Sequence, residues 1–179
     1  RKGIRSSEGV IPVKNRIRTI AISGVFAALV FIGTELRIPT AIGYINLGDA
    51  VILISSFLIG PLAAFPAAIG SALGDLVAGY PVYIFPTFII KGLMGLTAGF
   101  VLKSDGEKKI NLIRRILAGL AAEIIMVAGY FGAEVILYGI SAAAGSVPFN
   151  LVQGFAAIAV SLPLSYTLLP RLKKLAAIK

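Results

Sequence analysis

The chain contains no cysteine, no histidine and no tryptophan among its 179 residues. The lack of Cys and His excludes thiolate chemistry, disulfide frameworks, imidazole metal sites and His-based catalytic triads. Neither a P-loop of the form GxxxxGK[ST] nor a GxSxG elbow occurs, which excludes ATP hydrolysis by that loop and serine hydrolysis through that elbow. We therefore expect a protein that is not an enzyme and that holds no metal or cofactor.

Charge is scarce as well. Charged residues make up 14% of the chain, whereas soluble domains carry about 25%. Hydrophobic residues make up 58%, and the mean hydropathy is +0.94. So few charges cannot cover a water-exposed surface of this size, so the apolar runs are predicted to face lipid.

Runs long enough to cross a bilayer recur along the chain. A helix needs about 20 mostly apolar residues to do so. The predicted spans are 18–36, 47–60, 62–80, 82–102, 112–139 and 148–169. The second is short and ends at Gly60-Pro61, a helix stop, so it is expected to be thin or partly interfacial. The predicted fold is an all-α membrane protein, a compact bundle of six transmembrane helices.

Basic residues gather in three places, and only Arg37 and Lys91 lie elsewhere. The three groups are Arg1, Lys2, Arg5, Lys14, Arg16 and Arg18; Lys103, Lys108, Lys109, Arg114 and Arg115; and Arg171, Lys173, Lys174 and Lys179. With six spans all three groups lie on one side, which the positive-inside rule makes cytoplasmic. This predicts a cytoplasmic arm at 1–17, a membrane domain at 18–170 and a cytoplasmic tail at 171–179.

The net charge of +9 follows from these flanking clusters and from contact with anionic membrane lipid. It does not indicate a nucleic-acid partner, because the basic residues flank spans and do not line one folded basic face.

Asp75 and Lys91 lie inside apolar runs on either side of the turn Gly79-Tyr80-Pro81. An ionisable side chain in mid-bilayer costs on the order of 3 kcal/mol on insertion scales and normally faces a bundle interior or a watery cavity. Two interpretations follow. Asp75 and Lys91 could form an ion pair that only fixes helix packing, or both could line a polar pocket open to the outside, with tyrosines as flat walls.

Other polar residues also gather in the outer half of the predicted bundle. Tyr130, Glu134 and Tyr138 follow i, i+4, i+8 spacing on one helix face, whereas Glu123 lies near mid-membrane with its direction open. Tyr44, Tyr80 and Tyr83 could instead belong to an interfacial aromatic belt. The candidate ligand contacts are Glu35, Asn46, Asp49, Asp75, Tyr80, Lys91, Tyr130, Glu134, Asn150 and Gln153.

The run from NLGD at 46–49 through GSALGD at 70–75 and GYP at 79–81 to IIKG at 89–92 resembles the substrate-binding S components of energy-coupling factor (ECF) vitamin transporters. The resemblance is closest to the riboflavin and hydroxymethylpyrimidine S components. It implies a subunit of the bacterial cell membrane that binds one vitamin from outside. It also implies association with a transmembrane coupling protein (T component) and two cytoplasmic ATPases.

In this family small residues of the first helix contact the coupling protein. The matching positions here are Ala21, Ser23, Gly24, Ala27 and Ala28. Small residues at this spacing let helices approach closely, so internal packing is the alternative interpretation.

The substrate is less well defined by the residues. Without tryptophan and with scattered phenylalanines, a three-ring ligand would find little stacking surface, which favours hydroxymethylpyrimidine or pyridoxine. Riboflavin stays open through the resemblance, and pantothenate could place its carboxylate against Lys91. A different class, a stand-alone proton-coupled secondary transporter, would use Glu123 and Glu134 as proton carriers, although the two halves show no clear self-similarity.

Overall fold

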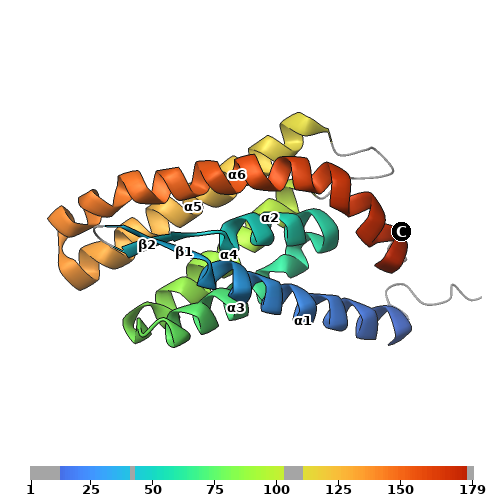
Figure 1. The fold of residues 1–179 in the computed structure, drawn as a ribbon, viewed down its shortest axis with the longest axis horizontal. Coiled ribbons are helices and arrows are strands. Elements are labelled where there is room, and N and C mark those ends of the chain that lie inside the picture. The colour runs from blue at the N-terminus through green and yellow to red at the C-terminus, as the bar shows by residue number, and fades with distance from the viewer. Residues whose placement is uncertain (1–12, 41–42, 103–110, 177–179) are drawn as a thin grey trace, which may run out of the picture.

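The computed structural model describes residues 13–40, 43–102 and 111–176 (Figure 1). The elements are α1 (Val13–Glu35), β1 (Arg37–Thr40), β2 (Gly43–Asn46), α2 (Gly48–Ile59), η1 (Gly60–Ala63), α3 (Ala64–Val77), η2 (Pro81–Tyr83), α4 (Ile84–Leu102), α5 (Leu112–Tyr138) and α6 (Ile140–Ala176). The six α-helices confirm the predicted all-α bundle. Those members of the three basic groups that fall within 1–12, 103–110 and 177–179 lie outside the described residues, so their predicted cytoplasmic placement stays a prediction.

The helices alternate in direction along the bundle (Figure 1). By length and hydropathy five helical stretches could cross a membrane, with Gly48–Val77 counted as one. Within that stretch, however, a Cβ added at Gly48 or at Gly74 would meet the side chain of Thr34. The start of α2 and the end of α3 therefore lie beside the same point of α1, and the chain reverses between them at η1. The start of α1 and the end of α6 consequently share one end of the bundle, as predicted.

Helix α2 is the short central helix of the bundle. Its 12 residues rise about 18 Å, less than the roughly 30 Å of a hydrocarbon core, which confirms the expected thin helix. It packs against α1, α4 and α6, and Ile52 and Leu53 are fully buried. Gly60, with φ of 62°, allows the turn that ends it. The backbone of this turn lies against Gly99 of α4, where an added Cβ would come within 2.3 Å of Gly60.

The ends of the first and last helices differ from the prediction. Helix α1 begins at Val13 and α6 begins at Ile140, rather than at 18 and 148. The predicted start at 148 coincides with Pro148, and proline often occupies the first turn of a helix. In the structure, however, Pro148 lies inside α6. The break before α6 is instead the single residue Gly139, with φ of 86°. Helix α6 also continues to Ala176, so much of the predicted tail is helical.

A short antiparallel β-ribbon between α1 and α2 was not predicted. Its register pairs Arg37 with Asn46 and Ile38 with Ile45. Sequence reasoning treated this segment as a loop, because four-residue strands are too short for a clear alternating pattern. The ribbon holds Asn46 beside the end of α1, directly before α2.

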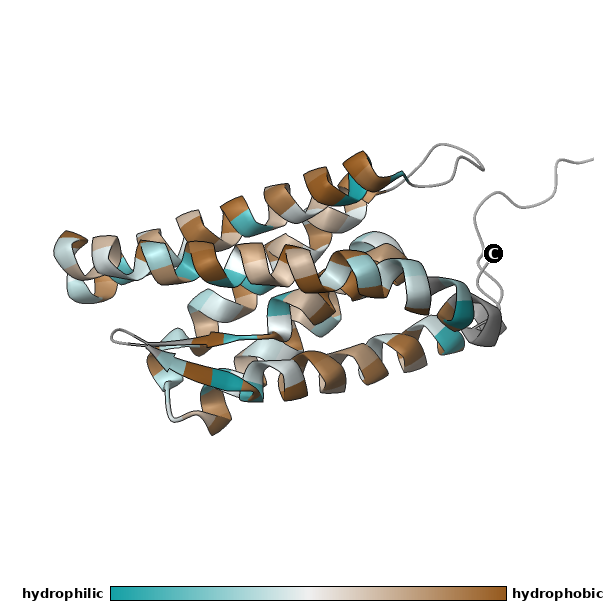
Figure 2. Cartoon of the chain, turned by 45° about the horizontal axis from the view of Figure 1, so that its top comes forward, coloured by the Kyte–Doolittle hydropathy of each residue, from teal (hydrophilic) through white to brown (hydrophobic). Residues whose placement is uncertain are grey.

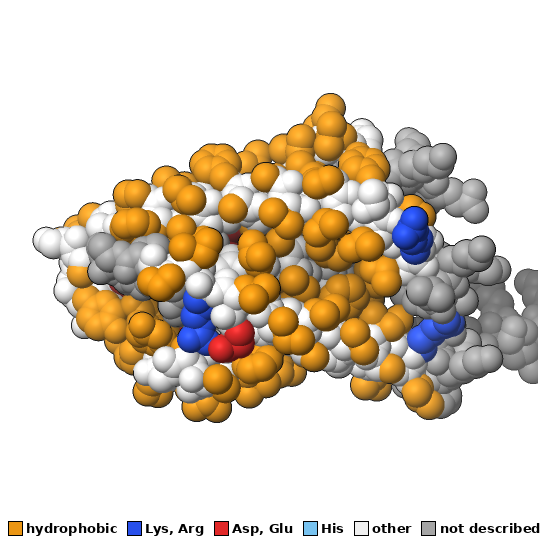
Figure 3. All heavy atoms as spheres, in the orientation of Figure 1, with side chains coloured by type: hydrophobic (Ala, Val, Ile, Leu, Met, Phe, Trp, Pro, Cys, Tyr) orange, Lys and Arg blue, Asp and Glu red, His pale blue; other side chains and the backbone are white. Residues whose placement is uncertain are grey.

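Apolar side chains cover most of the outside of the bundle. Hydrophobic residues occur along the whole length of the helices (Figure 2), and few charged side chains interrupt the face seen in Figure 3. Phe85 is 73% exposed and Ile136 is 85% exposed. Such a surface is suited to acyl chains rather than to water.

Candidate ligand-binding site

A buried ion pair joins α4 to α2. Lys91 Nζ donates to Asp49 Oδ1 over 2.5 Å, and the two residues are 3% and 0% exposed. Lys91 therefore pairs with Asp49 on α2, and not with Asp75 across the α3–α4 hairpin as one interpretation predicted. Asp49 lies in the first turn of α2, where the helix dipole also favours a negative charge.

The backbone around the ribbon fixes Asp49 in the core. Leu47 donates its amide N–H to the carbonyl of Gly33 over 3.0 Å, and Gly48 donates its N–H to Asn46 Oδ1 over 2.8 Å. A Cβ on Gly33 would come within 3.2 Å of Gly48, and one on Gly48 would come within 2.6 Å of Thr34 Oγ1, so these two glycines favour the close approach of α1 and α2. The first turn of α2, including Asp49, is thereby anchored to the end of α1.

Gln153 of α6 completes the hydrogen bonding of Asp49. Its Nε2 donates to Asp49 Oδ2 over 2.7 Å, and its Oε1 accepts from the backbone N–H of Asn46 over 2.9 Å. Each carboxylate oxygen of Asp49 thus has a donor. Four of the predicted contact residues, Asn46, Asp49, Lys91 and Gln153, form one network from three separate parts of the chain.

A chain of tyrosine rings leads from this network toward the outer turn. Lys91 Nζ lies 5.3 Å from the ring centroid of Tyr130, within the range of a cation–π contact. The ring centroid of Tyr83 lies 6.3 Å from that of Tyr130, 6.1 Å from that of Tyr138 and 6.4 Å from that of Tyr80. These spacings are typical of interacting aromatic pairs.

Glu134 lies within the same cluster. Its carboxylate accepts a hydrogen bond from Tyr83 over 3.4 Å and another from Ser146 of α6, and the residue is 7% exposed. Tyr83 thus contacts Tyr130, Glu134 and Tyr138, which confirms that these three residues share one face of α5.

Sequence reasoning missed Tyr83, Thr87 and Ser146 as members of the site. Tyr130 and Thr87 join through their hydroxyls over 2.9 Å. A signal was available, because Tyr83, Thr87 and Lys91 follow one another at i, i+4, i+8 spacing and so lie on one side of the α4 segment. Ser146 carried no such signal, because it lies ahead of the predicted sixth span.

The remaining candidates occupy different positions. Glu35 pairs with Arg37 in a partly exposed contact. Asp75 is 6% exposed, and its carbonyl accepts from the N–H of Tyr80 over 2.9 Å. The Nδ2 of Asn150 is buried and has no hydrogen-bond partner among the described residues.

The fold and the buried polar network define the class of protein. It is a compact multi-pass membrane protein with a buried polar network between its helices, joined to a tyrosine cluster whose outer members, Tyr80 and Tyr138, are exposed. The family described as "ECF-type riboflavin transporter, S component" matches residues 14–170. The chain therefore belongs to this family of transporter S components, which confirms the resemblance noted in the sequence.

Two similar proteins extend this comparison. A protein of Pyrococcus woesei described as "Uncharacterized protein in gap 3'region" is 35% identical over 139 residues, which cover 77% of this chain and 90% of that protein. A solved structure, titled "Structure and mechanism of the S component of a bacterial ECF transporter", has a TM-score of 0.68 at 23% identity. The match covers 88% of this chain and 99% of that one, so the two share a fold.

Proposed function

We propose that this protein is the high-affinity substrate-binding subunit of an ECF-type importer in the cell membrane, and that its ligand binds beside Lys91. The observation that carries the proposal is the junction of the Asp49–Lys91–Gln153 network with the tyrosine chain. Charged and amide groups there provide directional hydrogen bonds, and the rings provide flat apolar surface, which is the composition of small-molecule sites. The buried donor of Asn150 provides a further polar contact for a ligand.

Riboflavin is the first ligand to test. The family is described by that vitamin, and the four clustered tyrosines, Tyr80, Tyr83, Tyr130 and Tyr138, supply aromatic surface despite the lack of tryptophan. The preference for hydroxymethylpyrimidine or pyridoxine rested on scarce stacking surface, so it loses its main support. Both remain comparison ligands, together with pantothenate.

The binding experiment uses the full chain, purified alone in detergent. Riboflavin fluorescence is quenched when its ring is stacked on an aromatic side chain, so titration with protein gives the affinity directly. We expect tight binding of riboflavin without ATP, and no relief of the quenching by excess pantothenate. Tight binding of hydroxymethylpyrimidine or pyridoxine with none of riboflavin would overturn the choice of vitamin while leaving the proposed class intact.

The energy for transport would come from partners, a transmembrane coupling protein and two ATPases. An outward stripe on α1 supports a docking surface for the coupling protein. Ala21, Gly24 and Ala28 are exposed, and a Cβ added at Gly24 would meet nothing within 4 Å. Ala27 instead serves packing within the bundle, because its carbonyl lies against Gly70 of α3.

Reconstitution distinguishes this proposal from a stand-alone carrier. In vesicles that contain the chain alone, we expect vitamin binding but no accumulation under an imposed proton gradient. Accumulation by the chain alone would instead support a proton-coupled secondary transporter.

A further inference from the structure

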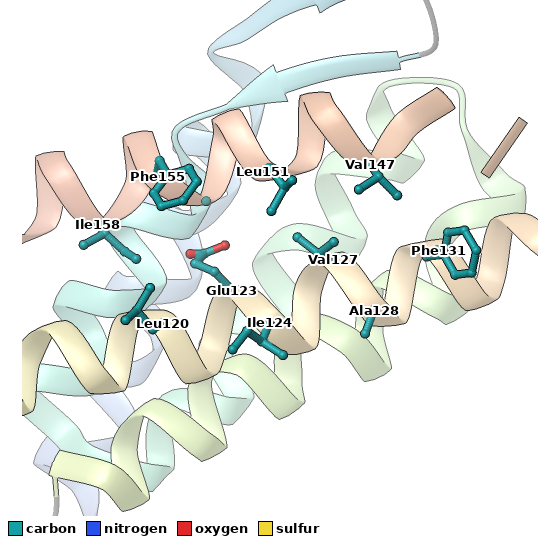
Figure 4. A pocket seen from close by; sticks show the side chains of 11 residues that line it. Leu120, Glu123, Ile124, Val127, Ala128, Phe131, Val147, Leu151, Phe155 and Ile158 are labelled. Atoms are coloured by element: carbon teal, nitrogen blue, oxygen red, sulfur yellow. The ribbon is translucent and has the colours of Figure 1, made fainter. Parts of the chain in front are cut away.

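A groove of about 340 Å³ lies between α5 and α6 (Figure 4). Its volume falls in the range of small-molecule sites. Leu120, Val127 and Leu151 are among the side chains that line it. Two others, Ile124 and Phe155, are 66% and 64% exposed. The groove therefore opens on the lipid-facing side of the bundle.

Glu123 lies at the floor of this groove (Figure 4). Among the described residues that line the groove, it is the single one with a polar side chain. The residue is 6% exposed, and neither of its carboxyl oxygens has a hydrogen-bond partner within the described part of the chain. A buried polar group without a partner is costly, so its presence in a native fold calls for a physical explanation.

The surroundings of Glu123 favour an uncharged partner. The ammonium of Lys91 already forms its ion pair with Asp49. Among the described residues no cation forms an ion pair with Glu123, and a neutral carboxylic acid offers one O–H donor and one carbonyl acceptor. A hydroxyl group, which both donates and accepts, complements these two functions.

We propose that the α5–α6 groove is a second ligand site, open to the bilayer, which binds a membrane-soluble alcohol through the carboxyl group of Glu123. The apolar walls hold the hydrocarbon part of the ligand, and the single polar side chain holds its single hydroxyl. Gly154 of α6 leaves the space beside the carboxyl, since an added Cβ would lie 3.0 Å from Oε2. The groove surface itself is apolar and both carboxyl oxygens are covered, so the side chain has to turn to meet the hydroxyl, and among the described residues no hydrogen bond opposes that rotation.

Dicyclohexylcarbodiimide, an apolar reagent for carboxylic acids, tests this site. The proton of the acid moves to a carbodiimide nitrogen, and the carboxylate oxygen bonds to the central carbon, so the product keeps every atom of both reactants. The full chain is reconstituted in phosphatidylcholine vesicles, and labelling of each carboxyl group is followed by peptide mass spectrometry. We expect Glu123 to be labelled faster than Glu134, whose two oxygens both accept hydrogen bonds.

Protection identifies the hydrogen bond. We expect 1-dodecanol to slow the labelling of Glu123 roughly fivefold more than dodecane at equal membrane concentration, the factor that one net hydrogen bond gives. Ala128→Trp, which fills the groove from its exposed wall, should also slow labelling, whereas Ala144→Trp at an exposed position outside the groove should not.

The proposal is overturned if Glu123 is not labelled, if dodecanol and dodecane protect equally, or if a water-soluble carbodiimide labels Glu123 as fast as the apolar reagent. The dodecanol comparison on the unmodified chain decides the matter even if Ala128→Trp fails to fold. No vitamin is present in these assays, so their failure is distinguishable from failure of the proposed vitamin-binding function.

Discussion

Lys91 and Asp49 lie 42 residues apart in the sequence, yet they form an ion pair in which the Lys91 side chain is 4% exposed and the Asp49 side chain is fully buried. A buried pair of this kind often contributes little net stability, because both charges lose their hydration. Removal of one partner is nevertheless strongly destabilising, because the other charge stays buried. The pair therefore couples α2 to α4 and couples any ligand contact at Lys91 to the integrity of the core.

The first prediction concerns this coupling. Lys91→Met should lower the free energy of unfolding by about 3–5 kcal/mol, because the carboxylate of Asp49 then lacks its cation. The double variant Asp49→Asn with Lys91→Met removes both charges and should recover much of that loss. Unfolding followed by far-UV circular dichroism in detergent gives both values.

Ligand affinity in the same variants separates the two roles of Lys91. If Lys91 contacts the ligand, the double variant should be nearly as stable as the unmodified chain but should still bind the vitamin weakly. Recovery of both stability and affinity would show that Lys91 serves packing alone.

The second prediction tests the donor that Gln153 presents to Asp49. Gln153→Glu replaces the Nε2 donor, 2.7 Å from Asp49 Oδ2, by a second carboxyl oxygen. Two facing carboxylates repel each other, so this variant should be less stable than Gln153→Leu, which merely removes the hydrogen bonds. Thermal unfolding of the two variants side by side checks the order, and equal stabilities would contradict it.

The third prediction separates the ring of Tyr130 from its hydroxyl group. Tyr130→Phe keeps the aromatic surface and loses the hydrogen bond to Thr87, so it should change ligand affinity little. Tyr130→Ala loses the ring and should weaken binding roughly tenfold, the upper range of an aromatic contact. The control is Tyr166→Ala, because that ring contacts Arg115 rather than any residue of the site, and it should leave affinity unchanged. Fluorescence titration measures all three.

The fourth prediction compares two glycines on α1 and α3. Gly70→Ala should destabilise the isolated protein, because the new Cβ would approach the carbonyl of Ala27 to 2.5 Å. Gly24→Leu should leave the isolated protein folded, because its side chain would project into open space. If α1 docks on the coupling protein, however, this variant should lose co-purification with the coupling protein. Unchanged co-purification of a folded Gly24→Leu protein would place the docking surface elsewhere.

The sequence by itself determined the membrane class, the number of α-helices and the shared end of the first and last helices. These depend on local quantities: the length of each apolar run, the scarcity of charge and the position of Lys and Arg beside the runs. The same local spacing placed Tyr130, Glu134 and Tyr138 on one face of α5. It did not define the ends of α1 and α6, because helix ends depend on single residues such as Gly139, whose conformation the surrounding chain decides.

Only the tertiary structure decided which polar residues meet. Asp75 is nearer to Lys91 in the sequence, but the close approach of Gly33 and Gly48 places Asp49 within reach of the ammonium. The register of the ribbon and the direction of α6 then bring Asn46 and Gln153 to the same carboxylate. The orientation of Glu123 was likewise undetermined until α5 packed against Gly154, because the partner of a buried side chain is set by contacts between helices and not by spacing within one helix.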